Sequence, residues 1–141
     1  MLKNFKFHHI GIAVKDIQKT CEVYEMGGYT RTDIIFDSIQ NVNICWLCKE
    51  GMPLMELLAP VDDTSPVNKT LEKMGVTPYH TCYVVENIEQ AIAELRKQKY
   101  VLVSKPAKAI AIHNCRVAFL HNRYVGLIEL VETPADIKKR G

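Results

Sequence analysis

One stretch of the sequence occurs twice, and this repeat limits the possible folds more than any other feature. The segment FHHIGIAVKDI near the N-terminus recurs as PYHTCYVVENI, so that His9 aligns with His80 at an offset of 71 residues. A second pair of segments, MELLAP around Glu56 and IELVETP around Glu129, matches at an offset of 73 residues. Repeated segments of this kind indicate repeated structural units. The sequence therefore predicts two copies of one module, each placing one His and one Glu at equivalent points.

The size and composition of the chain restrict what such modules can do. A copy of roughly 70 residues would bury little apolar surface alone, so we expect the two copies in the 141-residue chain to share a core. The apolar fraction of 48% and the net charge of +2 are ordinary for a globular protein and give no reason to expect nucleic-acid binding. We find no apolar run of about 18 residues and no signal peptide, which predicts a cytoplasmic protein without membrane contact.

Hydrophobic periodicity predicts the order βαβββ in each module and hence an α+β fold. In the first strand, His8, Ile10, Ile12 and Val14 should face the core, with His9 on the sparsely covered opposite face. The first module is predicted to contain strands at 8–14, 29–36, 42–48 and 53–59 and a helix at 17–27 capped by Asp16. The second is predicted to contain strands at 79–85, 100–104, 115–120 and 126–132 and a helix at 88–98 capped by Asn87.

The predicted boundaries follow from breaks in this pattern. Residues 1–62 form the first module, 63–77 a linker with a short helix, 78–133 the second module, and 134–141 a solvated tail. In the short helix at 66–74, we expect Ser65 as the N-cap and Val67, Leu71 and Met74 on one side.

The five cysteines have no spacing typical of a disulfide framework. Cys45 and Cys48 formally match C-x-x-C, but they lie in a predicted strand, where residues three apart point to opposite faces. Redox pairs usually lie near the start of a helix instead. We therefore expect reduced, structural thiols.

The four residues at repeat-equivalent strand positions, His9, Glu56, His80 and Glu129, are candidate metal ligands. Two imidazoles and two carboxylates suit a divalent first-row metal ion. Both glutamates lie among apolar strand residues, where a buried carboxylate is costly unless it is paired or bound to metal. The alternative is that strand alternation points each glutamate toward water. The repeat favours ligation, and no other histidine has a counterpart in the repeat.

These same residues carry a resemblance to a known family. The segments HIGIAVKDI, MELLAP, VAFL and IELVE, together with His80, resemble the vicinal oxygen chelate superfamily, which includes glyoxalases and bleomycin resistance proteins. The chain looks most like the methylmalonyl-CoA epimerases, and the linker PVDDTSPV is also similar to theirs. The resemblance covers about residues 5–133. It implies paired βαβββ modules that form a concave mixed sheet around one divalent ion (Co, Ni, Mn or Zn) held by His9, Glu56, His80 and Glu129.

The resemblance also implies a reaction. A metal-dependent isomerase or epimerase would move the proton alpha to a thioester carbonyl through a metal-bound enolate, with Glu129 as both ligand and base. Its partners would be a small acyl-thioester or thiol-adduct substrate and a second copy of the chain in a homodimer.

The sequence departs from the epimerase pattern at one important point. Epimerases of this type carry a second glutamate, acting from the opposite face of the carbon, where this chain has Ile39; Asp37 could replace it only if the loop shifts. A glyoxalase I-like lactoylglutathione lyase does not need that glutamate and is the first alternative. A non-catalytic ligand- or drug-binding module of the same fold is the second, although such binders need not retain a full ligand set.

Overall fold

The computed structural model describes residues 1–133, and the predicted tail at 134–141 lies outside the described residues. Among those residues are three α-helices, one 3-10 helix and nine strands, which confirms the α+β class. The chain divides into two compact units. One unit is 9–79; the other combines Met1–His8 with the residues from His80 onward. Each unit is described separately below.

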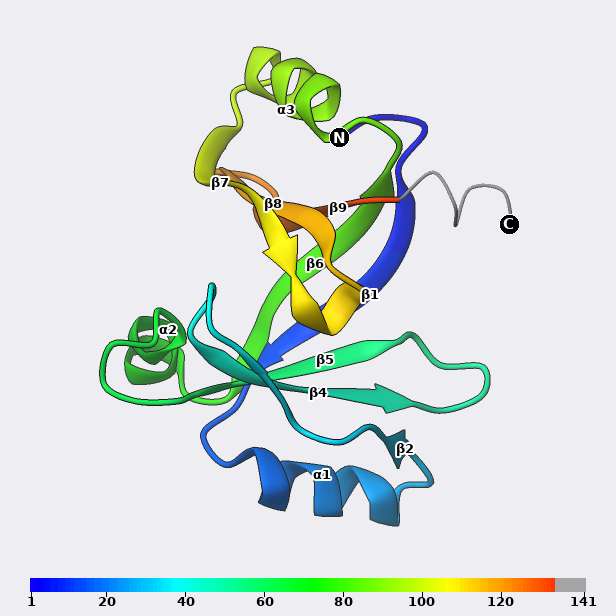
Figure 1. The fold of residues 1–141 in the computed structure, drawn as a ribbon, viewed down its shortest axis with the longest axis vertical. Helices are drawn as coiled ribbons and strands as arrows, with labels where there is room; N and C mark the ends of the chain where they lie inside the picture. The colour runs from blue at the N-terminus through cyan, green and yellow to red at the C-terminus, as the bar shows by residue number, and fades with distance from the viewer. Residues whose placement is uncertain (134–141) are drawn as a thin grey trace. The chain divides into compact units, whose positions relative to one another are not determined.

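The 9–79 unit contains a helix packed on a small mixed sheet (Figure 1). Its strand order is β2-β4-β5-β1, with β3 paired to β4; β1 and β5 run parallel, whereas β4 and β5 are antiparallel. The elements are β1 (Lys6–Ala13), α1 (Ile17–Met26), β2 (Thr30–Arg31), β3 (Ile35–Asp37), β4 (Val42–Cys48), β5 (Met55–Pro60) and α2 (Val67–Met74), of which Lys6–His8 belong to the other unit.

The apolar core of this unit lies between α1 and one face of its sheet. Asp16 begins α1, because its Oδ1 accepts a hydrogen bond from the Lys19 N–H at 3.0 Å, as the capping pattern predicts. The buried members of the core are Val14, Ile17, Cys21, Cys45, Leu47, Leu57 and Ala59. Because side chains alternate along a strand, the residues between these core positions point to the opposite face of the sheet.

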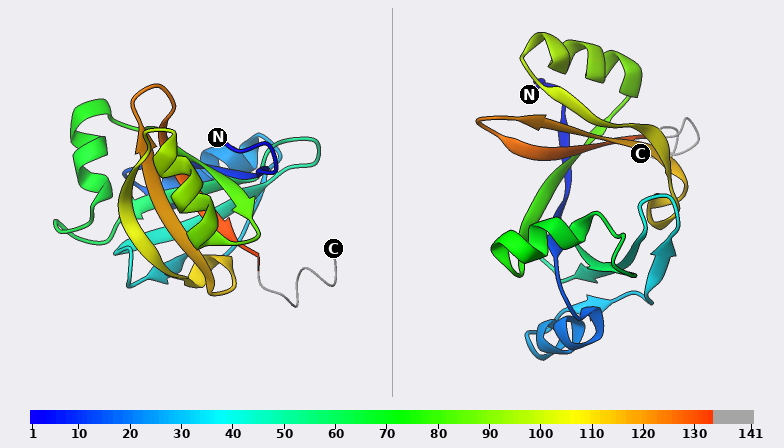
Figure 2. Two further views of the ribbon diagram at one scale, coloured as in Figure 1. Left: turned by 90° about the horizontal axis from the view of Figure 1, so that it is seen from above. Right: turned by 90° about the vertical axis from the view of Figure 1, so that its left-hand side faces the viewer.

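The second unit repeats this construction. Its elements are β6 (Thr77–Val85), α3 (Ile88–Lys97), β7 (Val101–Ala109), η1 (Ile110–Ile112), β8 (Cys115–Asn122) and β9 (Gly126–Glu132), of which Thr77–Tyr79 belong to the other unit. The strand order is β6-β9-β8-β7, with β6 parallel to β9 and the other pairs antiparallel. Figure 2 shows α3 lying along one face of this sheet. The N-terminal segment adds Phe5 and Phe7, whose rings lie 5.8 and 6.0 Å from that of Tyr83.

The start of α3 is fixed by two interactions. The Asn87 side chain accepts a hydrogen bond from the Gln90 N–H, and Glu132 Oε2 accepts one from the Ile88 N–H at 2.8 Å. Arg116 donates to both Glu132 and Glu89, and its hydrogen bonds lower the pKa of the Glu89 carboxyl. The core beneath the helix includes Ile88, Ile92, Leu95, Leu120, Ile128 and Leu130.

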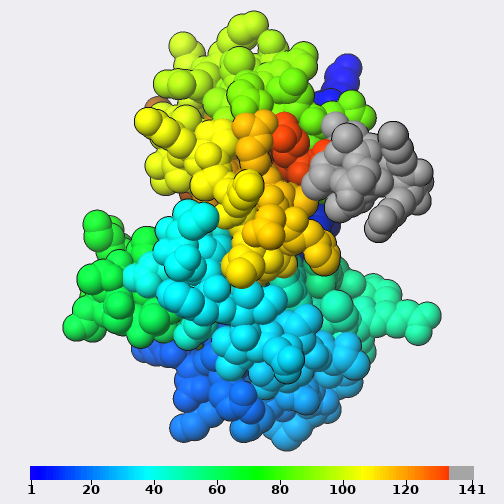
Figure 3. All heavy atoms as spheres, in the orientation of Figure 1, coloured from blue at the N-terminus to red at the C-terminus, as the bar shows by residue number. Residues whose placement is uncertain are grey.

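Several local predictions were wrong, each for an identifiable reason. The strand predicted at 29–36 is split into β2 and β3 by three residues without strand structure. Ser65 does not cap α2 with its side chain, because its Oγ instead accepts hydrogen bonds from the Val61 and Asp62 N–H groups. Of the three residues expected on one side of this helix, Val67 and Leu71 are buried, whereas Met74 is 70% exposed. Figure 3 shows α2 at the surface of the molecule, in green.

The face prediction for β1 was correct for part of the strand. Ile12 and Val14 join the α1 core, but His8 and Ile10 are only half-buried. The opposite face is more completely covered than predicted, since His9, Gly11 and Ala13 are all buried. Among residues 1–133, none of the helices combines the length and the apolar character needed to cross a bilayer.

Candidate functional site

In the 9–79 unit, Glu56 lies in the middle of a row that crosses three strands. Its register partners are Gly11 on β1 and Trp46 on β4. Its neighbour Leu57 belongs to the α1 core, so Glu56 projects from the sheet face that does not contact α1. The sheet thus separates an apolar face from a face that carries ionisable groups.

His9 lies on the same face as Glu56 and next to it. His9 Nε2 is 3.4 Å from Glu56 Oε1, and the His9 ring meets the Trp46 ring edge-on, with 4.9 Å between centroids. His9 is 0% and Glu56 3% exposed. We call these two residues the His9–Glu56 pair.

The second unit contains the same arrangement. Glu129 on β9 lies between its register partners Cys82 on β6 and Phe119 on β8. His80 Nε2 is 3.2 Å from Glu129 Oε1, and the His80 and Phe119 rings meet edge-on at 5.3 Å. Both members of this His80–Glu129 pair are buried. Each unit therefore brings its own His and Glu into contact, and the two pairs occupy equivalent places in the repeat.

The aromatic residue beside each histidine was not predicted. Trp46 and Phe119 each precede the unit's glutamate by ten residues, so the repeat itself contained the signal. Packed against the imidazole edge-on, each ring restricts the orientation of its histidine.

The chemistry of these donors fits a divalent metal ion. Carboxylate oxygen and imidazole nitrogen are ligands that divalent ions of the first transition row bind readily. In each pair, the donor atoms are too buried for bulk water to solvate them, and a bound cation would offset the cost of burying the carboxylate. The donor set therefore suits the ions predicted from the sequence.

The other candidate residues are placed differently. His113 and His121 are exposed on unit surfaces, and His8 is half-buried. Asp37 is buried and holds the turn after β3, because its Oδ1 accepts hydrogen bonds from the Ile39 and Gln40 N–H groups at 2.9 Å. Its Oδ2 accepts from the Gln40 side-chain amide. Asp37 could therefore take the role of the missing glutamate only by giving up this turn.

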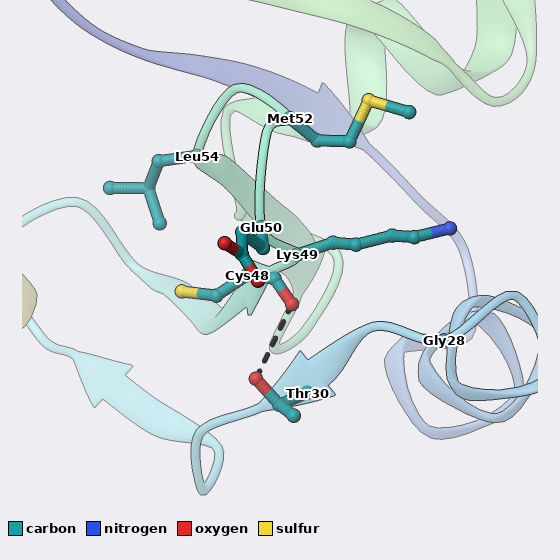
Figure 4. Close-up of a pocket in the computed structure, with 7 residues that line it drawn as sticks. All are labelled: Gly28, Thr30, Cys48, Lys49, Glu50, Met52 and Leu54. Carbon is teal, nitrogen blue, oxygen red and sulfur yellow. Dashed lines mark hydrogen bonds between the residues drawn. The ribbon is translucent and has the colours of Figure 1, made fainter.

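A pocket of about 350 Å³ in the 9–79 unit lies beside the predicted C-x-x-C motif rather than the His9–Glu56 pair (Figure 4). Cys48 lines it and is exposed, whereas Cys45 is buried, as the strand pattern predicted. The Lys49 side chain extends away from Cys48 and donates to the Gly27 carbonyl oxygen at the end of α1, at 2.8 Å. The pocket contains none of the four predicted ligands.

Comparison with known proteins agrees with these features. Residues 8–119 match the model of the glyoxalase/bleomycin resistance protein/dioxygenase superfamily. The mitochondrial methylmalonyl-CoA epimerases of Mus musculus and Homo sapiens are each 31% identical to the chain over 129 residues. These matches cover 89% of this chain and 71% and 72% of those proteins.

Solved structures show the same relationship. The methylmalonyl-CoA epimerase of Mycobacterium tuberculosis superposes with a TM-score of 0.82 at 27% identity, covering 99% of this chain and 97% of that one. A Streptomyces coelicolor methylmalonyl-CoA epimerase in complex with 2-nitronate-propionyl-CoA superposes with a TM-score of 0.79 at 26% identity, covering 92% and 95%. The repeat, the two buried His–Glu pairs and these similarities lead to one conclusion: the chain belongs to the glyoxalase/bleomycin resistance protein/dioxygenase superfamily and is a homologue of the methylmalonyl-CoA epimerases.

Proposed function

We propose that the chain is a metal-dependent isomerase that moves the proton alpha to the carbonyl of an acyl-CoA thioester, as a methylmalonyl-CoA epimerase does. The observation that carries the proposal is the buried His–Glu pair present in equivalent places in both units. Homology to methylmalonyl-CoA epimerases supports the substrate class. Vicinal oxygen chelate enzymes use such residues to hold one ion, and we assign His9, Glu56, His80 and Glu129 to that role.

The roles within the site follow from the donor chemistry. A bound divalent ion supplies positive charge that stabilises negative charge developing on the substrate carbonyl oxygen. Glu129 accepts the proton from the alpha carbon and returns it, while His9 and His80 position the ion. Trp46 and Phe119 keep the two imidazoles in orientation.

The isoleucine at position 39, where epimerases carry a glutamate, favours a second candidate function. Inversion at a carbon requires proton transfer on both faces, but a glyoxalase I-like lyase moves a proton between adjacent carbons and needs no second acid at that position. The Ile39 side chain is 64% exposed, and the nearby Asp37 carboxylate is used by the turn. Asp37 is therefore not available as the second acid while it holds this turn.

Deuterium exchange separates the two functions. In deuterated water, we expect the metal-loaded protein to incorporate deuterium at the alpha carbon of methylmalonyl-CoA, starting from either the R or the S isomer. Chiral analysis of the product then reports inversion. Turnover of methylglyoxal plus glutathione without exchange into methylmalonyl-CoA would replace the epimerase proposal by the lyase, and absence of both reactions would contradict both.

The Ile39→Glu variant tests the role of the missing glutamate. Because Ile39 is exposed, a glutamate at this position should be tolerated by the fold. If one base acts in the wild type, exchange should exceed inversion, and Ile39→Glu should raise the ratio of inversion to exchange by at least about 10-fold. Ile39→Gln, which has the same length but no acid, is the matched control. Equal ratios in all three proteins would show that inversion does not depend on this position.

The remaining predictions concern the assembly and its location. A homodimeric state and a cytoplasmic location stay predictions, while the mammalian relatives are mitochondrial proteins by name.

A further inference from the structure

Two cysteines that have no part in the proposed reaction lie in contact inside the 9–79 unit. Cys21 Sγ, on α1, is 3.4 Å from Cys45 Sγ, on β4. Both residues are free thiols and are 0% exposed. The C-x-x-C motif contains Cys45 and Cys48, but Cys48 is exposed while Cys45 is buried. The close pair is therefore formed by residues 24 positions apart, joined through the packing of α1 on β4.

We propose that Cys21 and Cys45 are an oxidative modification site, which hydrogen peroxide converts into an intramolecular disulfide. The two sulfurs need to approach by only about 1.4 Å to reach the length of a disulfide bond. They already face each other across the interface of α1 with β4, so closure needs no change in the order or pairing of the elements.

The reaction balances with peroxide as the only oxidant. The sulfur of Cys45 attacks one peroxide oxygen, the O–O bond breaks, and Cys45 becomes a sulfenic acid while water leaves. The sulfur of Cys21 then attacks the sulfenic sulfur, the S–S bond forms, and a second water departs with the thiol proton. Two thiols lose two electrons in total, and one peroxide molecule is reduced to two waters.

The segment between β2 and β3 gives peroxide a route to these sulfurs. The carbonyl oxygen of Thr32 lies 3.3 Å from Cys45 Sγ, and residues 32–34 are exposed. This segment is held to β4 by two hydrogen bonds between Thr32 and the backbone of Trp46, and β2 has only two residues. Segments with few buried contacts open at a small fraction of the free energy of global unfolding. Opening here would uncover Cys45 first.

The environment of the pair also sets its pH dependence. Burial, together with the neighbouring Cys45, raises the pKa of the Cys21 thiol to about 12. Because the thiolate is the attacking form, closure should be slow at neutral pH and should become faster as the pH rises.

The test is oxidation of the folded full chain with hydrogen peroxide, quenched with catalase and followed by denaturing alkylation. We expect two of the five thiols to become unreactive, with a Cys21–Cys45 cross-linked peptide in the digest. The linked residues are 24 apart, so the midpoint of thermal unfolding should rise by roughly 5–10 °C and return on reduction. The rate of cross-linking should increase between pH 7 and pH 9.

Three variants keep the result interpretable. Cys48→Ser should form the same cross-link, whereas Cys21→Ser and Cys45→Ser should form none; if either fails to fold, the peptide map of Cys48→Ser still decides. The proposal is overturned if folded protein gives only oxidised Cys48 or a sulfinic acid at Cys45. It is also overturned if the cross-link appears only in denaturant. Neither metal nor substrate enters this experiment, so its outcome is independent of the proposed function.

Discussion

Replacing either His9 or His80 with alanine is expected to abolish binding of the proposed divalent ion, although the two residues belong to different units. The proposed ion takes ligands from both the His9–Glu56 and the His80–Glu129 pair. Losing one imidazole leaves three donors and a buried carboxylate without its neighbour. Removal of an outer-shell partner costs about 10- to 100-fold in metal affinity, and we expect loss of a ligand to exceed about 100-fold. Metal content by mass spectrometry and titration calorimetry would measure the change.

The number of ions bound per chain tests whether the two pairs share one ion. Wild-type protein should bind one ion per chain, and each alanine variant should bind none at micromolar metal. If each pair held its own ion, the wild type would bind two and each variant would retain one, which would contradict a shared site. His121→Ala, which changes an exposed histidine, is the matched control and should bind like the wild type. His9→Gln and His80→Gln keep much of the side-chain volume if an alanine variant does not fold.

The sequence predicted the residues of each pair because the repeat preserved them at equivalent places on the strands. His9 and His80 occupy the same position, the fourth residue, of β1 and β6, and Glu56 and Glu129 lie among apolar residues of β5 and β9. A shift of one residue would move every side chain to the other face of the sheet. The hydrophobic pattern therefore constrained the direction in which each glutamate points.

What the sequence did not reveal depends on contacts between distant elements. Trp46 lies beside His9 because β4 pairs with β5 in one register; the repeat relates Trp46 to Phe119, but it does not show that either ring contacts a histidine. The contact between Cys21 and Cys45 requires the packing of a helix on a strand. The side chains of Ser65 and Asp37 likewise bind backbone groups that hydrophobic periodicity does not identify. Local patterns predicted the main elements and the caps at Asp16 and Asn87, whereas these contacts depend on how distant elements pack.

The Glu129→Gln variant is expected to lose at least about 100-fold in the rate of deuterium exchange, even when saturated with metal. Glutamine keeps the shape of the side chain and an oxygen that can contact the ion, but it cannot accept the substrate proton. The near-isosteric change should preserve the fold, since Glu129 lies in a well-packed strand between Cys82 and Phe119. Exchange rates would be measured across a metal titration, with thermal unfolding as the check on structure.

Glu56→Gln is the matched comparison, because Glu56 occupies the equivalent place in the other unit and contacts its histidine at nearly the same distance. Both variants lose one negative charge and should therefore weaken metal binding to a similar extent. If Glu129 is the base and Glu56 is only a ligand, added metal should restore a larger share of the exchange rate in Glu56→Gln. Equal residual rates at metal saturation would contradict the assignment of Glu129 as the base. A larger loss of exchange rate in Glu56→Gln would identify Glu56 as the base, without changing the proposed set of four ligands.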